Sequence, residues 1–172
     1  DSAVIWSTGD FSARRTLKGL RAAVNAAAFS PDGRYLVTAG DDRKLYVWRL
    51  EELLNEAAEP VPRALGGHNA KVVHLAFSAD GRRLASSSWD HAVGLWSVPA
   101  FESEGVLSGH DAPVTAALFA KDGLSLYSAG GDGHIRLWDV IKARYLRSLV
   151  NNGWGINVLA IDEDADCLAY GT

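Results

Sequence analysis

Short apolar runs alternate with polar turns along the whole chain. In the stretch VTAALFAKDGLSLYSAGGDGHIRLW, apolar runs at 114–119 and 124–129 are separated by a Lys-Asp-Gly turn. Glycine supplies the positive φ that a tight hairpin needs, so these runs are predicted to be antiparallel strands. A second glycine-rich turn leads to a predicted strand at 134–138, and a fourth strand is expected around 145–149. The pattern therefore predicts an all-β unit of four short strands.

The same pattern recurs along the chain. The stretches VNAAAFSPDGRYLVTAGDDRKLYVW and VVHLAFSADGRRLASSSWDHAVGLW precede the one above, and a weaker copy begins at Ile156. Four tryptophans close successive copies, at Trp6, Trp48, Trp96 and Trp138. They lie 42, 48 and 42 residues apart, and a four-stranded repeat of about this length is typical of a β-propeller blade. The longer interval holds an insertion whose segment 51–58 has a helix-forming composition, so we expect a turn or two of helix there.

Several short motifs resemble those of the WD-repeat β-propeller family. They are the Gly-His pairs at 67–68 and 109–110, AFSPDG at 28–33, AFSADG at 76–81, and the pair Trp138-Asp139. The resemblance covers essentially the whole chain. It implies an all-β propeller of about four blades of four antiparallel strands, which we expect to be part of a larger closed ring.

The repeat predicts where each blade begins and ends. The predicted units are a blade part at 1–17, blades at 18–65, 66–107 and 108–149, and a partial blade at 150–172. We expect the rest of a longer chain to complete the ring; a second copy is the next alternative, and closure of this chain on itself is the third. The chain begins at Asp1 and has no methionine, as expected of a processed chain, an excised piece or the ordered part of a longer protein.

The family resemblance also implies a buried hydrogen-bonded network inside each blade. Its members are a histidine, a serine or threonine, an aspartate and the closing tryptophan. The matching residues are His68, Ser86, Asp90 and Trp96 in one blade and His110, Ser128, Asp132 and Trp138 in the next. The blade before them keeps Thr38, Asp42 and Trp48 but has Leu20 at the histidine position, and the last has Asn152 there.

A Ser-His-Asp set can also indicate a hydrolase. A catalytic triad is needed once, whereas this set recurs in two blades, without a nucleophile-elbow sequence or a visible oxyanion hole. A buried histidine needs a hydrogen-bond partner at each ring nitrogen, which the set supplies. The sequence therefore predicts structural networks, no enzyme and no catalytic residue.

Metal and thiol chemistry are not predicted either. Cys167 lies in the apolar run CLAY and is expected to be a buried, inert thiol. His74, His91 and His134 show no metal-ligand spacing. The acidic turn at 162–166 lacks the glycine and the spacing of an EF-hand loop. We therefore predict no metal site and no cofactor.

Two tryptophans do not fit the repeat. Trp89 lies in a strand-to-strand turn where the other copies have Asp41 and Gly131, and Trp154 precedes the first strand of the last copy. The resemblance maps both to loops on one face of the propeller. Large aromatic side chains in loops are typical of interface hot spots, although each could instead pack on its own blade or line the channel mouth. The candidate partner-binding residues are Trp89, Trp154, Asn25, Val73, Thr115 and Asn157.

Charge and hydropathy narrow the class of partner. The net charge is −4 with no basic patch, which argues against a nucleic acid, and no apolar run is long enough to span a membrane. The leading hypothesis is a non-enzymatic protein–protein interaction scaffold. One alternative is the propeller domain of a larger bacterial enzyme or electron-transfer protein, for example joined to a c-type cytochrome, with its active site outside these residues. Another is an engineered or excised propeller fragment that assembles into a ring. The sequence indicates neither the partner nor the compartment, cytoplasmic or periplasmic.

Overall fold

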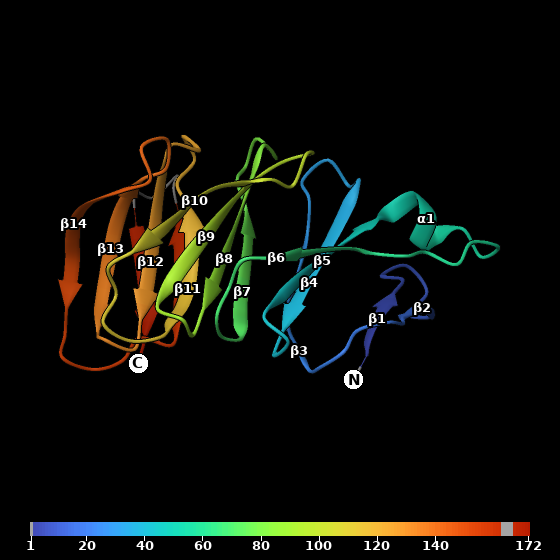
Figure 1. The fold of residues 1–172 in the computed structure, drawn as a ribbon, viewed down its shortest axis with the longest axis horizontal. Helices are drawn as coiled ribbons and strands as arrows, with labels where there is room; N and C mark the ends of the chain where they lie inside the picture. The colour runs from blue at the N-terminus through green and yellow to red at the C-terminus, as the bar shows by residue number, and fades with distance from the viewer. Residues whose placement is uncertain (1, 163–166) are drawn as a thin grey trace.

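The computed structural model describes residues 2–162 and 167–172 and shows a row of antiparallel sheets (Figure 1). Three sheets have four strands each, and a two-stranded hairpin lies at each end of the sequence. The all-β propeller architecture predicted from the repeat is confirmed. The ring is not closed, because the first and last strands belong to separate sheets. Residues 163–166 of the predicted acidic turn lie outside the described residues.

Each complete blade has its strands in sequence order. Blade 1 consists of β3 (Val24–Phe29), β4 (Tyr35–Gly40), β5 (Lys44–Arg49) and β6 (Arg63–Gly66). Blade 2 consists of β7 (Val72–Phe77), β8 (Arg83–Ser88), β9 (Ala92–Ser97) and β10 (Ser103–Ser108). Blade 3 consists of β11 (Val114–Phe119), β12 (Ser125–Gly130), β13 (His134–Asp139) and β14 (Arg144–Asn151). The end hairpins pair β1 (Ala3–Trp6) with β2 (Ala13–Leu17) and β15 (Val158–Asp162) with β16 (Cys167–Gly171).

The turn between the first two strands has the same design in blades 1 and 2. Ser30 and Ser78 donate their hydroxyls to Asp32 and Asp80, at 2.6 and 2.7 Å. Gly33 follows with φ 69°, in the left-handed region that glycine adopts without strain. The SPDG and SADG motifs are therefore self-bonded hairpin turns.

The core lies between blades, because side chains alternate across each strand. On β8, Leu84 packs in one cluster with Val37 of blade 1. Its neighbour Ala85 packs in another cluster with Val114 of blade 3. Each complete blade therefore buries both faces against its neighbours, as a β-propeller requires.

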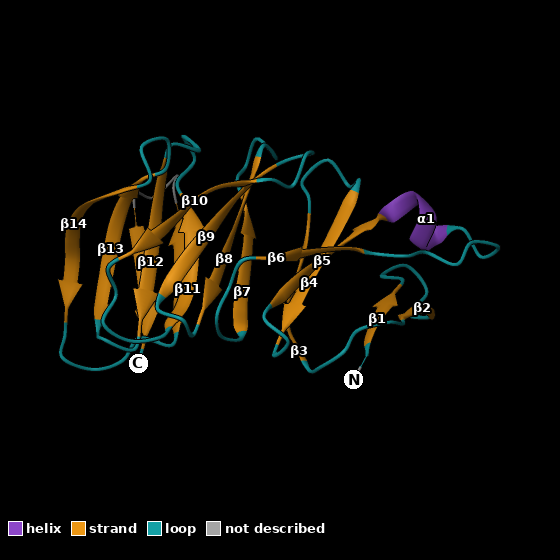
Figure 2. Cartoon of the chain, viewed as in Figure 1, coloured by secondary structure: helices purple, strands orange, loops and turns teal. Residues whose placement is uncertain are grey.

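The insertion after β5 forms a short helix and a loop. Helix α1 (Leu50–Leu54) is followed by an irregular loop (Figure 2). In this loop the Asn55 side chain accepts the backbone N–H of Ala57. The turn or two of helix predicted for this segment is therefore present, beginning one residue earlier, at Leu50. Leu53 is buried against the first hairpin, and the Arg15 guanidinium donates to the carbonyls of Asn55 and Ala58 at 2.8 and 2.9 Å. Within the described ranges α1 is the only helix, and nothing there could cross a bilayer as a helix.

Candidate functional site

The histidine network of blade 2 joins its first loop to its third strand. His68 Nδ1 lies 2.9 Å from Asp90 Oδ2, and its Nε2 lies 2.7 Å from Ser86 Oγ. The indole N–H of Trp96 donates to the same hydroxyl at 2.9 Å. Because the hydroxyl accepts from Trp96, its own proton is available for His68 Nε2, which leaves Nδ1–H to donate to the carboxylate.

The carboxylate of Asp90 also ties two loops together. It accepts the backbone N–H of Asn69 at 2.8 Å and that of Ala92 at 3.2 Å. Burial raises the pKa of Asp90, but the hydrogen bonds from Asn69 and His68 outweigh burial and hold the pKa below its usual value. The residue is therefore a charged anchor for the loops around it.

Blade 3 repeats this network and adds a cation. His110 lies 2.9 Å from Asp132 Oδ1 and 2.7 Å from Ser128 Oγ, and the indole of Trp138 donates to Ser128 at 2.7 Å. The guanidinium of Arg136, which is largely buried, donates to Asp132 Oδ2 at 2.8 Å. Burial lowers the pKa of His110, so the imidazole is neutral near pH 7.

In blade 1 a tyrosine on the third strand takes the place of the loop histidine. Trp48 donates to Thr38 Oγ1 at 3.1 Å, as in the other blades. Leu20 packs at the edge of the same cluster, and the hydroxyl of Tyr46 donates to Asp42 at 2.7 Å. The aspartate thus keeps a side-chain partner although the histidine is absent.

One position of the third strand, two residues before the closing tryptophan, lies against the network in each blade and holds a different residue type each time. It holds Tyr46 in blade 1, Gly94 in blade 2 and Arg136 in blade 3. A Cβ at Gly94 would lie 2.8 Å from Ser86 Oγ and 3.1 Å from His68 Nε2, so only glycine fits beside that histidine. Sequence reasoning missed this position, because its three residues share no chemical class and only the strand register places them against the network.

The network serines are unsuited to nucleophilic catalysis. Ser86 and Ser128 have no exposed surface, and each is enclosed by a histidine and a tryptophan. A nucleophile must reach its substrate, which these hydroxyls cannot do in the folded blade. What the geometry supports is a rigid connection between the loops and the strands.

Trp89 stands on the loop face of blade 2 with a cation against it. Its side chain is 47% exposed, and the ammonium of Lys71 lies 3.4 Å from the ring centroid. The backbone N–H of Trp89 donates to the Lys71 carbonyl at 3.0 Å, and Gly131 in blade 3 makes the same bond to Pro113. The turn of blade 2 therefore has the same backbone hydrogen bond as the turn of blade 3, and the indole of Trp89 is not required for it.

The side chain of Trp154 is more exposed than that of Trp89, at 76%. Its backbone N–H donates to the side chain of Asn152, the residue at the histidine position of the last copy, at 2.8 Å. Gly155, next to it, packs against Gly131 of blade 3. By the repeat, Trp89 and Trp154 lie on the same face, with the small residues of blade 3 between them. We call the loops at 69–71, 89–91 and 152–155 the tryptophan face.

The other candidate partner residues have contacts within the propeller. Asn25 and Thr115 are bulge residues of β3 and β11, where the register shifts. The Asn25 amide donates to Asp41 and to the carbonyl of Val72 in the next blade, at 2.7 and 3.3 Å. Thr115 donates to the carbonyl of Ile156 at 2.6 Å. Val73 has the same place in blade 2, and Asn157 is exposed before β15.

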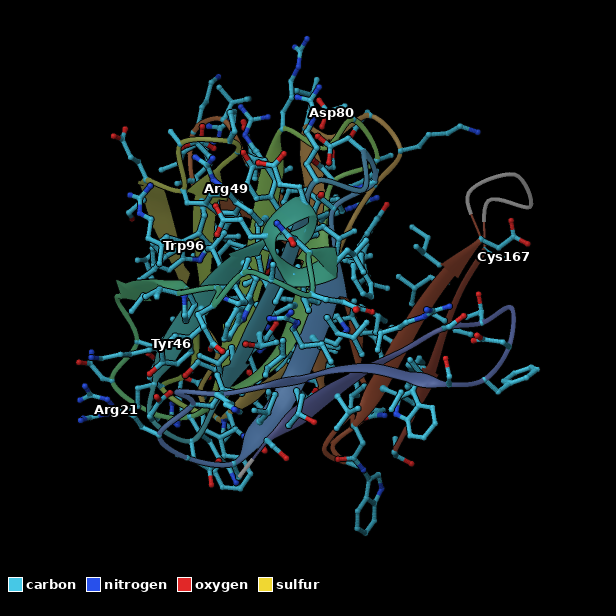
Figure 3. All side chains as sticks on the ribbon, turned by 90° about the vertical axis from the view of Figure 1, so that its right-hand side faces the viewer. Arg21, Tyr46, Arg49, Asp80, Trp96 and Cys167 are labelled. Carbon is cyan, nitrogen blue, oxygen red and sulfur yellow. The ribbon has the colours of Figure 1, made fainter. Side chains whose placement is uncertain are left out.

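The expectation that Cys167 is buried was wrong. Cys167 is exposed at the end of the β15–β16 hairpin (Figure 3). An apolar strand is buried only where a neighbouring blade covers it, and among the described strands β16 has none beside it other than β15. Cys167 borders an open cavity of about 380 Å³ that Tyr127, Leu149 and Leu168 also line.

The remaining histidines are separate from one another. His91 is exposed, and His134 lies 2.9 Å from Ser148 Oγ. Burial lowers the pKa of His74, which lies on β7. In the described part of the chain, no three His, Cys, Asp or Glu side chains are grouped so that they could hold a metal ion.

The chain was compared with known protein families and with curated proteins, and a family model matches it at three stretches. The family model described as WD domain, G-beta repeat matches residues 11–49, 60–97 and 101–139, more than half of the chain. Each match begins just before the last strand of one sheet and ends with the third strand of the next. None of the curated proteins with which the chain was compared matches it.

The three matches coincide with the repeat seen in the sequence and with the blades of the structure. The tryptophan that closes each match is buried in its blade and bonded to a serine or threonine. The chain therefore belongs to the WD-repeat family of β-propellers.

Proposed function

We propose that the chain is a non-enzymatic protein-interaction scaffold that binds its partner at the tryptophan face. WD-repeat propellers are in general interaction modules, which sets the class of function. The observation that supports this face is the exposure of Trp89 and Trp154 on loops whose backbone is held by the blade itself. Neither indole is needed for the turn it lies in, since the other copies have aspartate, glycine or alanine there.

Rigid loops with exposed aromatic side chains are well suited to binding. A fixed loop loses little conformational entropy when a partner binds, and a tryptophan supplies a large contact area. The Lys71 ammonium above Trp89 adds a donor that a carboxylate or carbonyl of the partner can accept. A protein or peptide segment with apolar and acidic side chains fits this combination.

A pull-down comparison tests the proposal. The tagged chain is incubated with a lysate of its source organism, beside the double variant Trp89→Ala/Trp154→Ala and the control Leu124→Ala. Leu124 is 52% exposed in the turn between β11 and β12, at the opposite end of the strands. Proteins retained by the wild type and the control should be lost from the double variant. Retention of the same proteins by all three would refute the proposal.

We further infer that other blades complete the ring, from a longer chain or, as the second alternative, from a second copy. Trp6 is 60% exposed on β1, whereas Trp48 is 2% exposed on β5, where β4 lies beside it. β1 and β16 each leave one edge unpaired among the described strands, and such edges favour strand addition. Sedimentation distinguishes the alternatives: a stable monomer of 18.4 kDa excludes the second copy.

A further inference from the structure

The junction between blades 2 and 3 differs from the junctions on either side. Where blade 1 meets blade 2, the bulge residue Asn25 donates to the carbonyl of Val72. Where blade 3 meets the last hairpin, the bulge residue Thr115 donates to the carbonyl of Ile156. Val73 has the equivalent bulge position at the junction between blades 2 and 3, and a valine side chain has no donor. This junction, the 2–3 junction, therefore lacks a hydrogen bond that both its neighbours have.

The same junction has two polar side chains that its neighbours lack. His74 on β7 pairs in register with Ser87 on β8. The equivalent pairs are Ala26 with Ala39 in blade 1 and Ala116 with Ala129 in blade 3. Two alanines in each of the other blades thus become a histidine and a serine in blade 2.

Both polar side chains point toward blade 3. Ser87 lies two residues after Ala85, on the same side of β8, and Ala85 packs in one cluster with Val114 and Ala117 of β11. His74 is directly opposite Ser87 and shares its side. Among the described residues, neither His74 Nδ1 nor Ser87 Oγ has a hydrogen-bond partner, although both atoms are buried. A buried polar atom without a partner favours any state in which water reaches it.

Among the described residues, no charged group compensates for the burial of His74 at this junction. β7 and β11 have no other titratable side chain, and on β8 the only one is Arg83, paired with Glu104 at 2.8 Å at the far end of the strand. Of the charged residues in the nearby loops, Lys71 lies on Trp89 and Asp90 is bonded to His68. A proton on the imidazole would therefore have no counter-ion while the junction is closed.

We propose that the 2–3 junction is a pH-responsive seam that opens when His74 is protonated and so changes the relative position of Trp89 and Trp154. The seam lies between these two tryptophans, since Trp89 belongs to blade 2 and Trp154 follows blade 3. The effect on partner binding rests on the proposed function; the opening itself does not.

The direction of the pH dependence follows from burial. Burial lowers the pKa of His74 in the closed junction, whereas a hydrated imidazole titrates near its ordinary value of about 6.5. Opening therefore takes up a proton once the pH falls below about 6.5, and each further pH unit raises the open population by up to about tenfold. The closed junction is favoured above this range.

Hydrogen exchange of the whole chain at pH 7.5 and pH 5.5, corrected for intrinsic rates, tests the opening. Exchange in β8 and β11 should rise by up to about tenfold at pH 5.5, with little change in β3 and β4. His74→Ala, which reproduces the alanine of blades 1 and 3, should abolish the rise. His74→Gln, polar but not titratable, should abolish it too. Val73→Thr should slow exchange at both pH values by donating to the Val114 carbonyl.

Two results would refute the proposal that the 2–3 junction opens when His74 is protonated. One is an acid-induced rise that persists in both His74 variants, and the other is a rise that spreads equally over all blades, as in global acid unfolding.

Partner retention at both pH values tests the effect of the opening on partner binding: the wild type should lose its partner at pH 5.5 and His74→Ala should keep it. A seam that opens without loss of the partner contradicts only the link between them. Retention by Trp89→Ala/Trp154→Ala contradicts the proposed function and leaves the opening intact.

Discussion

Replacing Gly94 by alanine should destabilise the propeller through the network of blade 2. The added Cβ would lie 2.8 Å from Ser86 Oγ, 3.1 Å from His68 Nε2 and 3.1 Å from the indole nitrogen of Trp96. Overpacking a buried site costs roughly 1–3 kcal/mol. Displacing the serine hydroxyl also weakens at least one network hydrogen bond, worth about 1 kcal/mol. We therefore expect Gly94→Ala to lower the free energy of unfolding by about 2–4 kcal/mol.

Urea denaturation followed by tryptophan fluorescence measures this change. The matched control is Gly66→Ala on β6, where an added Cβ meets nothing within 4 Å. The control should differ from the wild type by less than about 0.5 kcal/mol. If Gly94→Ala proves as stable as Gly66→Ala, the network does not occupy the space that the structure assigns to it, and the reasoning is refuted.

Three further predictions concern blade 1, blade 3 and the first hairpin. Tyr46→Phe removes the hydroxyl that bonds Asp42 and should cost about 1 kcal/mol in the same urea assay; an unchanged midpoint contradicts the tyrosine's role as a substitute for histidine. Because burial lowers the pKa of His110, unfolding takes up a proton, so stability should fall as the pH drops below about 6.5. His110→Leu, which copies Leu20 of blade 1, should weaken this pH dependence, as thermal melts at pH 7.5 and 5.5 would show. Arg15→Ala removes two bonds to the insertion and should speed hydrogen exchange in β1 and β2 but not in blades 2 and 3; uniform exchange would contradict a local role.

The blade architecture could be predicted from the sequence because its determinants are local. Each hairpin is specified by a turn such as SPDG, and each strand by the alternation of apolar and polar residues. The set His68, Ser86, Asp90 and Trp96 could be identified because the same residue types return at the same spacing in the next copy.

Features that depend on strand register or on neighbours could not be predicted. Tyr46 and Arg136 look like ordinary strand residues until pairing places them against an aspartate. Asn25 and Thr115 were predicted to contact a partner, but each donates a hydrogen bond to the next blade. The bulges that orient these side chains cannot be recognised in the sequence. Cys167 lies in an apolar run, and only the absence of a covering strand in the described structure exposes it.

Site-specific photocrosslinking tests the central claim most directly, that the tryptophan face contacts the partner. A photoreactive amino acid is placed at Trp89, at Trp154 or, as a control, at Leu124 on the opposite side of the blades. The account predicts a crosslinked partner from the first two positions and none from the third. Crosslinks from Leu124 without any from the two tryptophan positions would contradict it.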